Sequence, residues 1–223
     1  MEEKFRKIKE IVEKELSCSA HSMDHVMRVY NLCLHIAENE EIDLDILKAA
    51  ALLHDIARVK EDNDFTGNTD HAILSSKMAA PILQKLSFSD DKIKHIQDCI
   101  VSHRYRTGNK PQTKEARILF DADKLDVLGA IGIARSFVWV GRNNAKIYAN
   151  VDIDEYIKDN LGGKINGRIQ DKTKHSPQIE FETKLKFLCD KLYTNKAKKI
   201  CRERTKFYKN FLNRLEKEIK GEF

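Results

Sequence analysis

Hydrophobic residues recur every three or four positions along most of this 223-residue chain, and this spacing constrains the fold more than any other feature. Such a period places apolar side chains on one face of an α-helix. Glycine and proline are scarce, with nine and three residues, whereas all-β folds need many turns. The sequence therefore predicts an all-α protein built from long helices.

The expected helices follow from capping residues and from the polar segments between them. A first helix ends near Leu16, a second starts after the capping residue Ser22, and Asp43 caps a very apolar third helix that we expect at the centre. Polar loops are expected over residues 61–70 and 104–113. A fourth helix is expected after the first loop, and a fifth starts at Ser89. A sixth spans 114–141 and bends near Gly129 and Gly132. Two final helices span 178–193 and 195–220.

The helical pattern decays between residues 143 and 177, where we expect a loop or a small appendage. Long loops in compact domains are often functional, so a mobile flap is one interpretation. We expect a single domain over residues 1–223. Its core spans about 18–142, and the helices of about 178–220 pack back on that core.

The composition excludes several classes of protein. With 41% hydrophobic and 34% charged residues, the chain matches neither a disordered tail nor a membrane bundle. No apolar run approaches the ~20 residues of a transmembrane helix, and the charged N-terminal segment does not resemble a signal peptide. We therefore predict a cytoplasmic protein. Its five cysteines form no CxxC motif, which favours reduced thiols over a disulfide framework.

The net charge of +5 is unevenly distributed, because residues 191–220 hold eleven Lys or Arg and only three Glu. A basic helix of this kind binds nucleic acid or a phosphate-bearing ligand in some proteins. The alternative interpretation is a solvated helix face.

An adjacent histidine and aspartate, His54 and Asp55, stand in the otherwise apolar segment AALLHDIAR. A buried carboxylate is costly unless something positive compensates it, and a metal ion is one such compensation. A buried ion pair or a capped loop end would serve equally well. His25, between Asp24 and Val26, is open to the same two interpretations, a metal ligand or a hydrogen-bonded interior histidine.

Three acids, Asp121, Asp123 and Asp126, interrupt the apolar segment ILFDADKLDVLGAIG and need cations or hydrogen-bond donors. Salt bridges to Lys124 and Arg117 are one solution. A mixed set of two imidazoles and two carboxylates would be another. Such a set suits Mn, Fe, Co, Ni or Mg better than structural zinc, which favours thiolates. That set is His25, His54, Asp55 and Asp123.

The arrangement of these residues resembles the HD superfamily of metal-dependent phosphohydrolases, in which the pattern H…HD…D lies on helices. The segments that carry the resemblance are HSMDHVMRVYNLCLHIA, AALLHDIAR, DHAILSSKMAAPIL, CIVSHRYR and ILFDADKLDVLGAIGIARSF. FETKL and TNKAKKICRER are similar to the C-terminal pattern of a small bacterial and archaeal subgroup that includes nucleoside-triphosphate pyrophosphatases. The resemblance is good over about 18–142, moderate over 178–215 and weak over 143–177.

The resemblance implies one divalent metal ion, with Mn, Mg, Fe, Co or Ni as candidates, held by His25, His54, Asp55 and Asp123. Asp121 and Asp126 would then orient the ligands from behind. Many relatives have Trp-Glu before the first histidine, where this chain has Met23-Asp24. That difference leaves the ligand in place.

His71 and His103 match segments that bind a second metal in dinuclear members of the family and line the pocket in mononuclear ones. This chain has His103-Arg104 in place of the His-His pair typical of dinuclear members, which favours one metal. The implied roles are deprotonation of water by Asp55 and protonation of the leaving oxygen by His71 or His103.

The chain has no glycine-rich phosphate loop, so we expect the metal and basic side chains to hold phosphate. The candidates are Arg28, Arg104, Lys124 and Lys184, together with Arg106 and Arg204, and a solvated surface residue is the alternative interpretation of each. The expected partner is a small phosphate ester, in particular a nucleotide, with no membrane partner.

The resemblance implies hydrolysis of a nucleoside or deoxynucleoside triphosphate to pyrophosphate. The alternatives are a 5′-nucleotidase, another phosphomonoesterase or phosphodiesterase, and a non-catalytic metal-containing module that binds nucleotide or nucleic acid. A homodimer is compatible with the sequence.

Overall fold

The computed structural model describes residues 1–16, 23–104 and 108–222, and within these ranges it contains helices and no strand. The expected all-α class is therefore confirmed. The chain divides into two compact units, a first unit of Met1–Asp123 and a second unit of Lys124–Phe223. The expectations of a single domain and of C-terminal helices packed on the core stay predictions. No helix in the described ranges has the length and apolar character needed to span a membrane.

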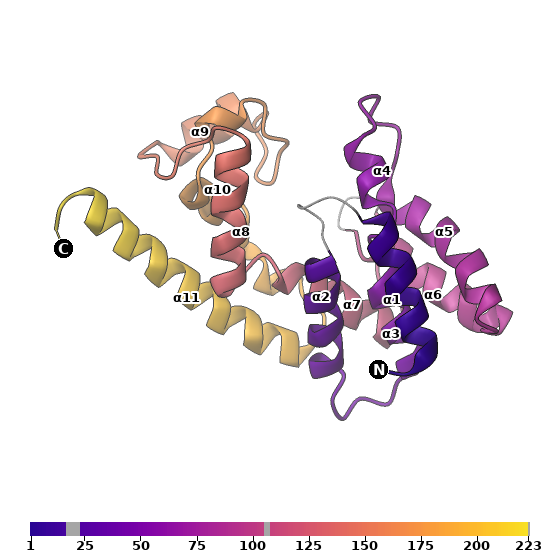
Figure 1. Cartoon of the computed structure of the whole chain (residues 1–223). Coiled ribbons are helices and arrows are strands. Elements are labelled where there is room, and N and C mark those ends of the chain that lie inside the picture. Colours follow the sequence, from indigo (N-terminus) through magenta and orange to yellow (C-terminus); the bar gives the residue numbers. More distant parts are fainter. Residues whose placement is uncertain (17–22, 105–107, 223) are drawn as a thin grey trace. The chain divides into compact units, whose positions relative to one another are not determined.

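The first unit is organised around a very apolar helix, as expected. The helices of this unit are α1 (Glu3–Glu15), α2 (Met23–Ile36), α3 (Leu44–Leu53), α4 (Arg58–Asp62), α5 (His71–Lys85), α6 (Asp90–Ser102) and α7 (Lys114–Leu125), the last of which crosses the unit boundary (Figure 1). The apolar helix is α3, which packs against α1, α2, α5 and α6. Its residues from Ala49 to Leu53 are fully buried.

Side-chain caps set where two of these helices begin. The carboxylate of Asp43 accepts hydrogen bonds from the first backbone N–H groups of α3, as expected. Asp70 caps α5 in the same way and thereby makes His71 its first residue. The expected cap Ser22 lies outside the described residues, and Ser89 precedes α6 without a side-chain capping bond. The polar loop expected from residue 61 starts later, because Glu61 belongs to α4.

The single helix expected over 114–141 is wrong. The chain leaves the helix after Leu125, and α8 (Gly129–Arg142) begins four residues later. Gly129 has φ = +69°, a left-handed conformation that glycine adopts without steric cost. Arg204 donates a hydrogen bond of 2.8 Å to the Leu125 carbonyl, and Arg135 Nη1 lies 2.5 Å from the Asp126 carboxylate. These two bonds stabilise the non-helical segment between α7 and α8.

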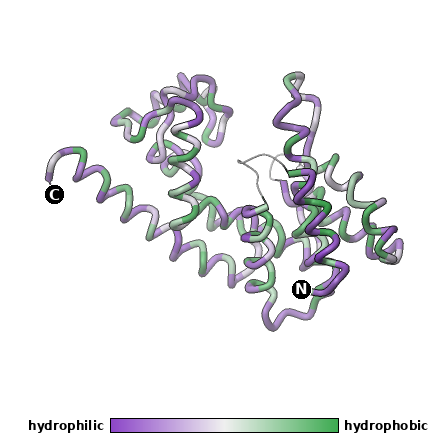
Figure 2. Tube along the Cα trace, in the orientation of Figure 1, coloured by the Kyte–Doolittle hydropathy of each residue, from purple (hydrophilic) through white to green (hydrophobic). Residues whose placement is uncertain are grey.

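The second unit pairs α8 with the long C-terminal helix α11 (Asn195–Ile219). Hydrophilic and hydrophobic residues alternate along α11, as expected for a helix with one buried face (Figure 2). The expected helix over 178–193 is shorter than the pattern suggested. It is α10 (Pro177–Thr183), followed by 3-10 turns at Leu185–Phe187 and Cys189–Lys191.

A disulfide links Cys189 to Cys201 on α11, so the expectation of reduced thiols is wrong for these two cysteines. Cys33 and Cys99 are free and buried, as expected of structural thiols. Cys18 lies outside the described residues.

The segment 143–177 contains more regular structure than the sequence indicated. The helix α9 (Ile153–Asn160) and a 3-10 turn at Lys172–Lys174 lie within it. Tyr156, Leu161 and Ile179 form a small apolar core, which ties the segment to α10. The Asn160 side chain also exchanges two hydrogen bonds with the backbone of Asp171. The expected appendage is therefore folded around its own helix.

Candidate metal centre

Six residues that the sequence singled out lie together in the first unit. The list is His25 on α2, His54 and Asp55 at the end of α3, His71 at the start of α5, His103 at the end of α6 and Asp123 on α7. All except Asp123 are buried, and the side chain of Asp123 is 16% exposed. Five different helices therefore contribute to one cluster of imidazoles and carboxylates.

A first donor group consists of His25, His54 and Asp55, with Asp123 beside it. The Nε2 atoms of His25 and His54 are 3.3 Å apart, and they lie 3.7 and 3.8 Å from Asp55 Oδ2. Asp123 Oδ1 lies 3.4 Å from His25 Nε2. The spacing within the group is compatible with one metal ion. The four expected metal ligands are thus brought together.

A second donor group consists of Asp55, His71 and His103. The Nε2 atoms of His71 and His103 are 3.3 Å apart, and they lie 3.3 and 3.5 Å from Asp55 Oδ1. The two groups share Asp55, which directs one carboxylate oxygen toward each.

Hydrogen bonds on the far side of the rings fix where the protons sit. Nδ1 of His54 is 2.8 Å from the Ala51 carbonyl, and Nδ1 of His103 is 2.6 Å from the Ile100 carbonyl. A carbonyl oxygen only accepts, so each Nδ1 must carry the hydrogen. In its neutral form each ring therefore turns an Nε2 lone pair toward Asp55. Backbone partners of this kind are typical behind metal-binding histidines.

Burial sets the charge of the cluster. It lowers the pKa of His54 to about 4, although Asp55 opposes the shift. It lowers the pKa of His71 as well. Burial works to raise the pKa of Asp55, but the surrounding histidines, His54 foremost, hold it well below its usual range. At neutral pH His54 and His71 are therefore neutral imidazoles beside an ionised Asp55 carboxylate.

The surroundings of the Asp55 carboxylate test whether a metal ion fits the cluster. Its Oδ1 atom is buried and, within the described part of the chain, has no hydrogen-bond partner. The nitrogens nearest to it are Nε2 of His71 and Nε2 of His103, at 3.3 and 3.5 Å, and the neutral Nδ1–H form of His103 turns a lone pair toward it. A buried anion facing lone pairs is unfavourable without a cation. Imidazole nitrogens and carboxylate oxygens are suitable ligands for a first-row divalent ion, so the residues fit the group.

Three residues of a neighbouring ion-pair network complete the surroundings of His71. The Glu61 carboxylate lies 2.7 Å from His71 Nδ1, 3.1 Å from Arg58 Nη1 and 2.7 Å from Arg104 Nη1. Arg104 also contacts Asp70 at 2.8 Å. Arg58 and Glu61 are not predicted from the sequence, where the one signal is their place three and six positions after Asp55.

The remaining predicted site residues have the following surroundings. Asp121 is fully buried, and Asp126 lies in the second unit against Arg135. Lys184 pairs with Glu180 at 2.6 Å, also in the second unit. Arg28 and Lys124 are partly buried. Arg106 lies outside the described residues.

Two further histidines serve local structure. His95 contacts Thr113 and Glu115. His175 is buried between Tyr156 and Glu180.

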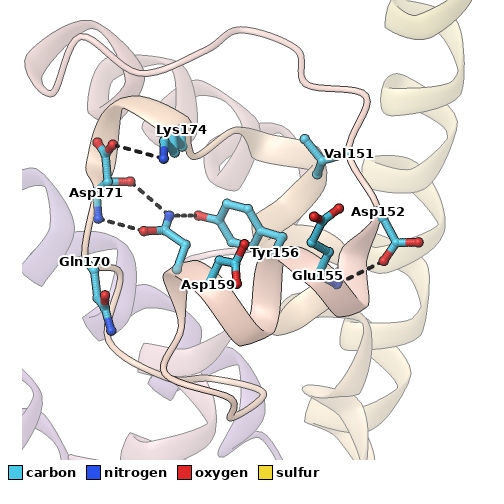
Figure 3. A pocket seen from close by; sticks show the side chains of 9 residues that line it. Val151, Asp152, Glu155, Tyr156, Asp159, Gln170, Asp171 and Lys174 are labelled. Carbon is cyan, nitrogen blue, oxygen red and sulfur yellow. Dashed lines mark hydrogen bonds and ion pairs between the residues drawn. The ribbon is translucent and has the colours of Figure 1, made fainter.

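A separate cavity of about 430 Å³ lies in the second unit beside α9, and it is acidic (Figure 3). Asp152 caps α9, and Asp171 caps the 3-10 turn and faces Lys174 at 3.9 Å. Exposed Glu155 and Asp159 add two more negative charges. An acidic lining repels phosphate esters, so this cavity does not compete with the histidine cluster as a phosphate site.

Comparison with known proteins places these residues in a family context. The HD domain family model matches residues 23–128, a range that includes both donor groups. The chain is 30% identical over 213 residues to the protein YpgQ of Bacillus subtilis, which covers 91% of this chain and 86% of YpgQ.

Solved structures extend the likeness over nearly the whole chain. An HD-superfamily hydrolase from Bacillus thuringiensis is 26% identical with a TM-score of 0.71, covering 98% of this chain and 97% of the other. B. subtilis YpgQ in complex with ADP is 26% identical with a TM-score of 0.70, covering 96% and 94%.

Proposed function

Since the chain belongs to the HD-domain superfamily of hydrolases, we propose that it is a metal-dependent phosphohydrolase that acts on nucleotides. One observation carries the proposal, the buried Oδ1 atom of Asp55, which has no hydrogen-bond partner among the described residues and lies 3.3 and 3.5 Å from Nε2 of His71 and His103. A divalent ion held by this cluster would supply the cationic centre that activates water in a metal-dependent phosphohydrolase.

The proposed holders of the ion are His25, His54, Asp55 and Asp123. A divalent ion held there supplies Lewis acidity, which lowers the pKa of a bound water and polarises a phosphoryl oxygen. The burial of His54 and Asp55 excludes bulk water and strengthens electrostatic interactions in the cluster. Asp55 is also the proposed acceptor of the water proton, because its carboxylate is ionised and held between the two donor groups.

The number of ions is a separate part of the proposal. The sequence favours one ion, since Arg104 stands where dinuclear relatives have a second histidine. The second donor group favours a second ion, because Asp55, His71 and His103 bring three buried donors together. We retain one ion at the first donor group as the core of the proposal. Metal analysis of the purified protein separates the two cases.

Proton donation to the leaving oxygen is proposed for His71 or His103. The Nδ1 atoms of the two rings are engaged by Glu61 and by the Ile100 carbonyl. A proton for the leaving oxygen must therefore be carried on Nε2, the nitrogen of each ring that lies beside Asp55.

The proposed substrate is a nucleoside or deoxynucleoside triphosphate, cleaved between the α- and β-phosphates to release pyrophosphate. The structure of YpgQ in complex with ADP supports a nucleotide with a phosphate chain. A triphosphate carries about four negative charges, more than one divalent ion balances. The proposed basic contacts are Arg28, Arg104, Lys124 and Lys184. Arg104 and Lys184 must exchange their carboxylate partners to serve this role.

The test is a panel of nucleoside mono-, di- and triphosphates assayed with Mg²⁺, Mn²⁺, Co²⁺ and Ni²⁺, with pyrophosphate and orthophosphate measured separately. We expect pyrophosphate from triphosphates in the wild type and no product from Asp55→Asn. His35→Asn is the matched control, because His35 is an exposed histidine on the same helix as His25.

Orthophosphate from monophosphates, with triphosphates untouched, would replace the proposed substrate by that of a 5′-nucleotidase. Absence of turnover with all four metals would favour a non-catalytic module. Salt-sensitive binding to RNA or DNA would then identify a nucleic-acid-binding module, for which the basic helix α11 is the candidate contact surface.

A further inference from the structure

Glu61 joins three separate parts of the first unit through one carboxylate. It lies on α4, and its oxygens contact His71 at the start of α5, Arg104 just after α6 and Arg58 on its own helix. Its side chain is 17% exposed. Burial works to raise the pKa of Glu61, but His71 and the two arginines hold it below the ordinary value. The carboxylate is therefore an ionised acceptor at neutral pH.

Two groups compete for Nδ1 of His71. Glu61 Oε2 lies at 2.7 Å and can only accept a hydrogen, whereas Arg58 Nη1 lies at 3.1 Å and can only donate one. The shorter contact to the anion requires a hydrogen on Nδ1, because a lone pair there would face the carboxylate. Arg58 then donates to Glu61 itself, at 3.1 Å. The neutral His71 ring consequently carries its lone pair on Nε2.

That lone pair faces the second donor group. His71 Nε2 is 3.3 Å from Asp55 Oδ1 and 3.3 Å from His103 Nε2, whose own hydrogen is on the far side of the ring. Without Glu61, the group left at Nδ1 is the Arg58 donor. The hydrogen of His71 would then move to Nε2 and point at Asp55, where it would satisfy the carboxylate in place of a cation.

We propose that Glu61 is a positioning residue: it selects the Nδ1–H form of His71 and so prepares Asp55, His71 and His103 to hold a cation. The inference rests on the proposed function for its purpose, because a cation next to Asp55 serves phosphate chemistry. The proposed effect of Glu61 is on the tautomer of the neutral His71 ring, that is, on which of its two nitrogens carries the hydrogen.

The experiment follows the His71 tautomer by ¹⁵N NMR in metal-free protein at about pH 8, where an unperturbed imidazole is neutral. Mn²⁺ binding to the same samples is measured by calorimetry. In the wild type we expect the hydrogen on Nδ1. In Glu61→Ala we expect it on Nε2, together with weaker Mn²⁺ binding at the second donor group by about 10–100-fold.

Two further variants separate positioning from structural support. In Glu61→Ala combined with Arg58→Met the competing donor is gone, so the Nδ1–H form and part of the Mn²⁺ affinity should return. Glu115→Gln is the matched control, because Glu115 is a buried acid of the same unit that contacts His95 and accepts from the Asp43 backbone. It should change stability and leave the His71 tautomer and Mn²⁺ binding unaltered.

A His71 hydrogen that stays on Nδ1 in Glu61→Ala would overturn the inference, as would unchanged Mn²⁺ binding. A double variant no better than Glu61→Ala would overturn it as well. None of these readings depends on turnover. If the wild type hydrolyses no nucleotide, the proposed function fails while the role of Glu61 is still decided by the tautomer and by Mn²⁺.

Discussion

The stability of the metal-free protein should depend on pH through His54. Its side chain is fully buried, and burial lowers its pKa to about 4, whereas the unfolded chain has the ordinary value of ~6.5. Between these two values the unfolded chain binds a proton that the folded protein does not. The free energy of unfolding therefore rises with pH through this window. The contribution of His54 to it is lost as the pH falls from ~6.5 to ~4.

The magnitude follows from the separation of the two pKa values. Each unit is worth about 1.36 kcal/mol, so the full window is worth about 3 kcal/mol. Between pH 7 and pH 5 the contribution of His54 is about 2 kcal/mol. His71, whose pKa is also lowered by burial, adds to the slope in the same direction.

The assay compares urea unfolding of chelator-treated wild type and His54→Asn at pH 7 and pH 5. Asparagine keeps an N–H donor for the Ala51 carbonyl but does not titrate. The wild type should lose about 2 kcal/mol more than the variant between the two pH values. His71 contributes to both proteins, so the difference isolates His54. His35→Asn, an exposed control, should behave like the wild type. Equal slopes for wild type and His54→Asn would refute the reasoning.

Three other predictions concern the cluster and the disulfide. Asp55→Ala should abolish turnover, yet in chelator its melting temperature should equal or exceed that of the wild type, because an unsatisfied buried carboxylate is gone; a clearly lower melting temperature would contradict this. Mn²⁺ at 100 times its dissociation constant should stabilise the wild type by about 2.7 kcal/mol in urea unfolding, and Asp55→Ala should show no such gain. Reducing the Cys189–Cys201 bond, twelve residues apart, should lower the free energy of unfolding by about 3 kcal/mol, and Cys201→Ser should then be insensitive to dithiothreitol.

The sequence predicted the first donor group because its members break an apolar pattern. His54 and Asp55 end a helix of alanine and leucine, and such residues need a compensating partner wherever they are buried. The structure brings them to His25, 29 residues earlier than His54. Sequence spacing alone does not give that distance, since it depends on how α2 packs on α3.

The parts that the sequence did not predict depend on single local contacts. Glu61 looked like the start of a polar loop, and its role follows only from the approach of His71 and Arg104, 10 and 43 residues away. The sequence predicts only a bend near Gly129, because apolar spacing continues past Leu125. A left-handed Gly129 and the hydrogen bond from Arg204 end the helix there instead.

Asp55 makes the two donor groups interdependent, and the charge balance shows why the metal count matters for the substrate. Asp55 and Asp123 together balance one divalent ion, so a one-ion centre is close to neutral, and a triphosphate there depends on basic side chains. A second ion beside His71 and His103 leaves the centre positive by itself, because Glu61 is already paired with two arginines. Removing Arg104 should therefore weaken triphosphate binding strongly in a one-ion protein and only slightly in a two-ion protein. The same carboxylate that holds the ion thus determines how much of the phosphate charge the rest of the chain must neutralise.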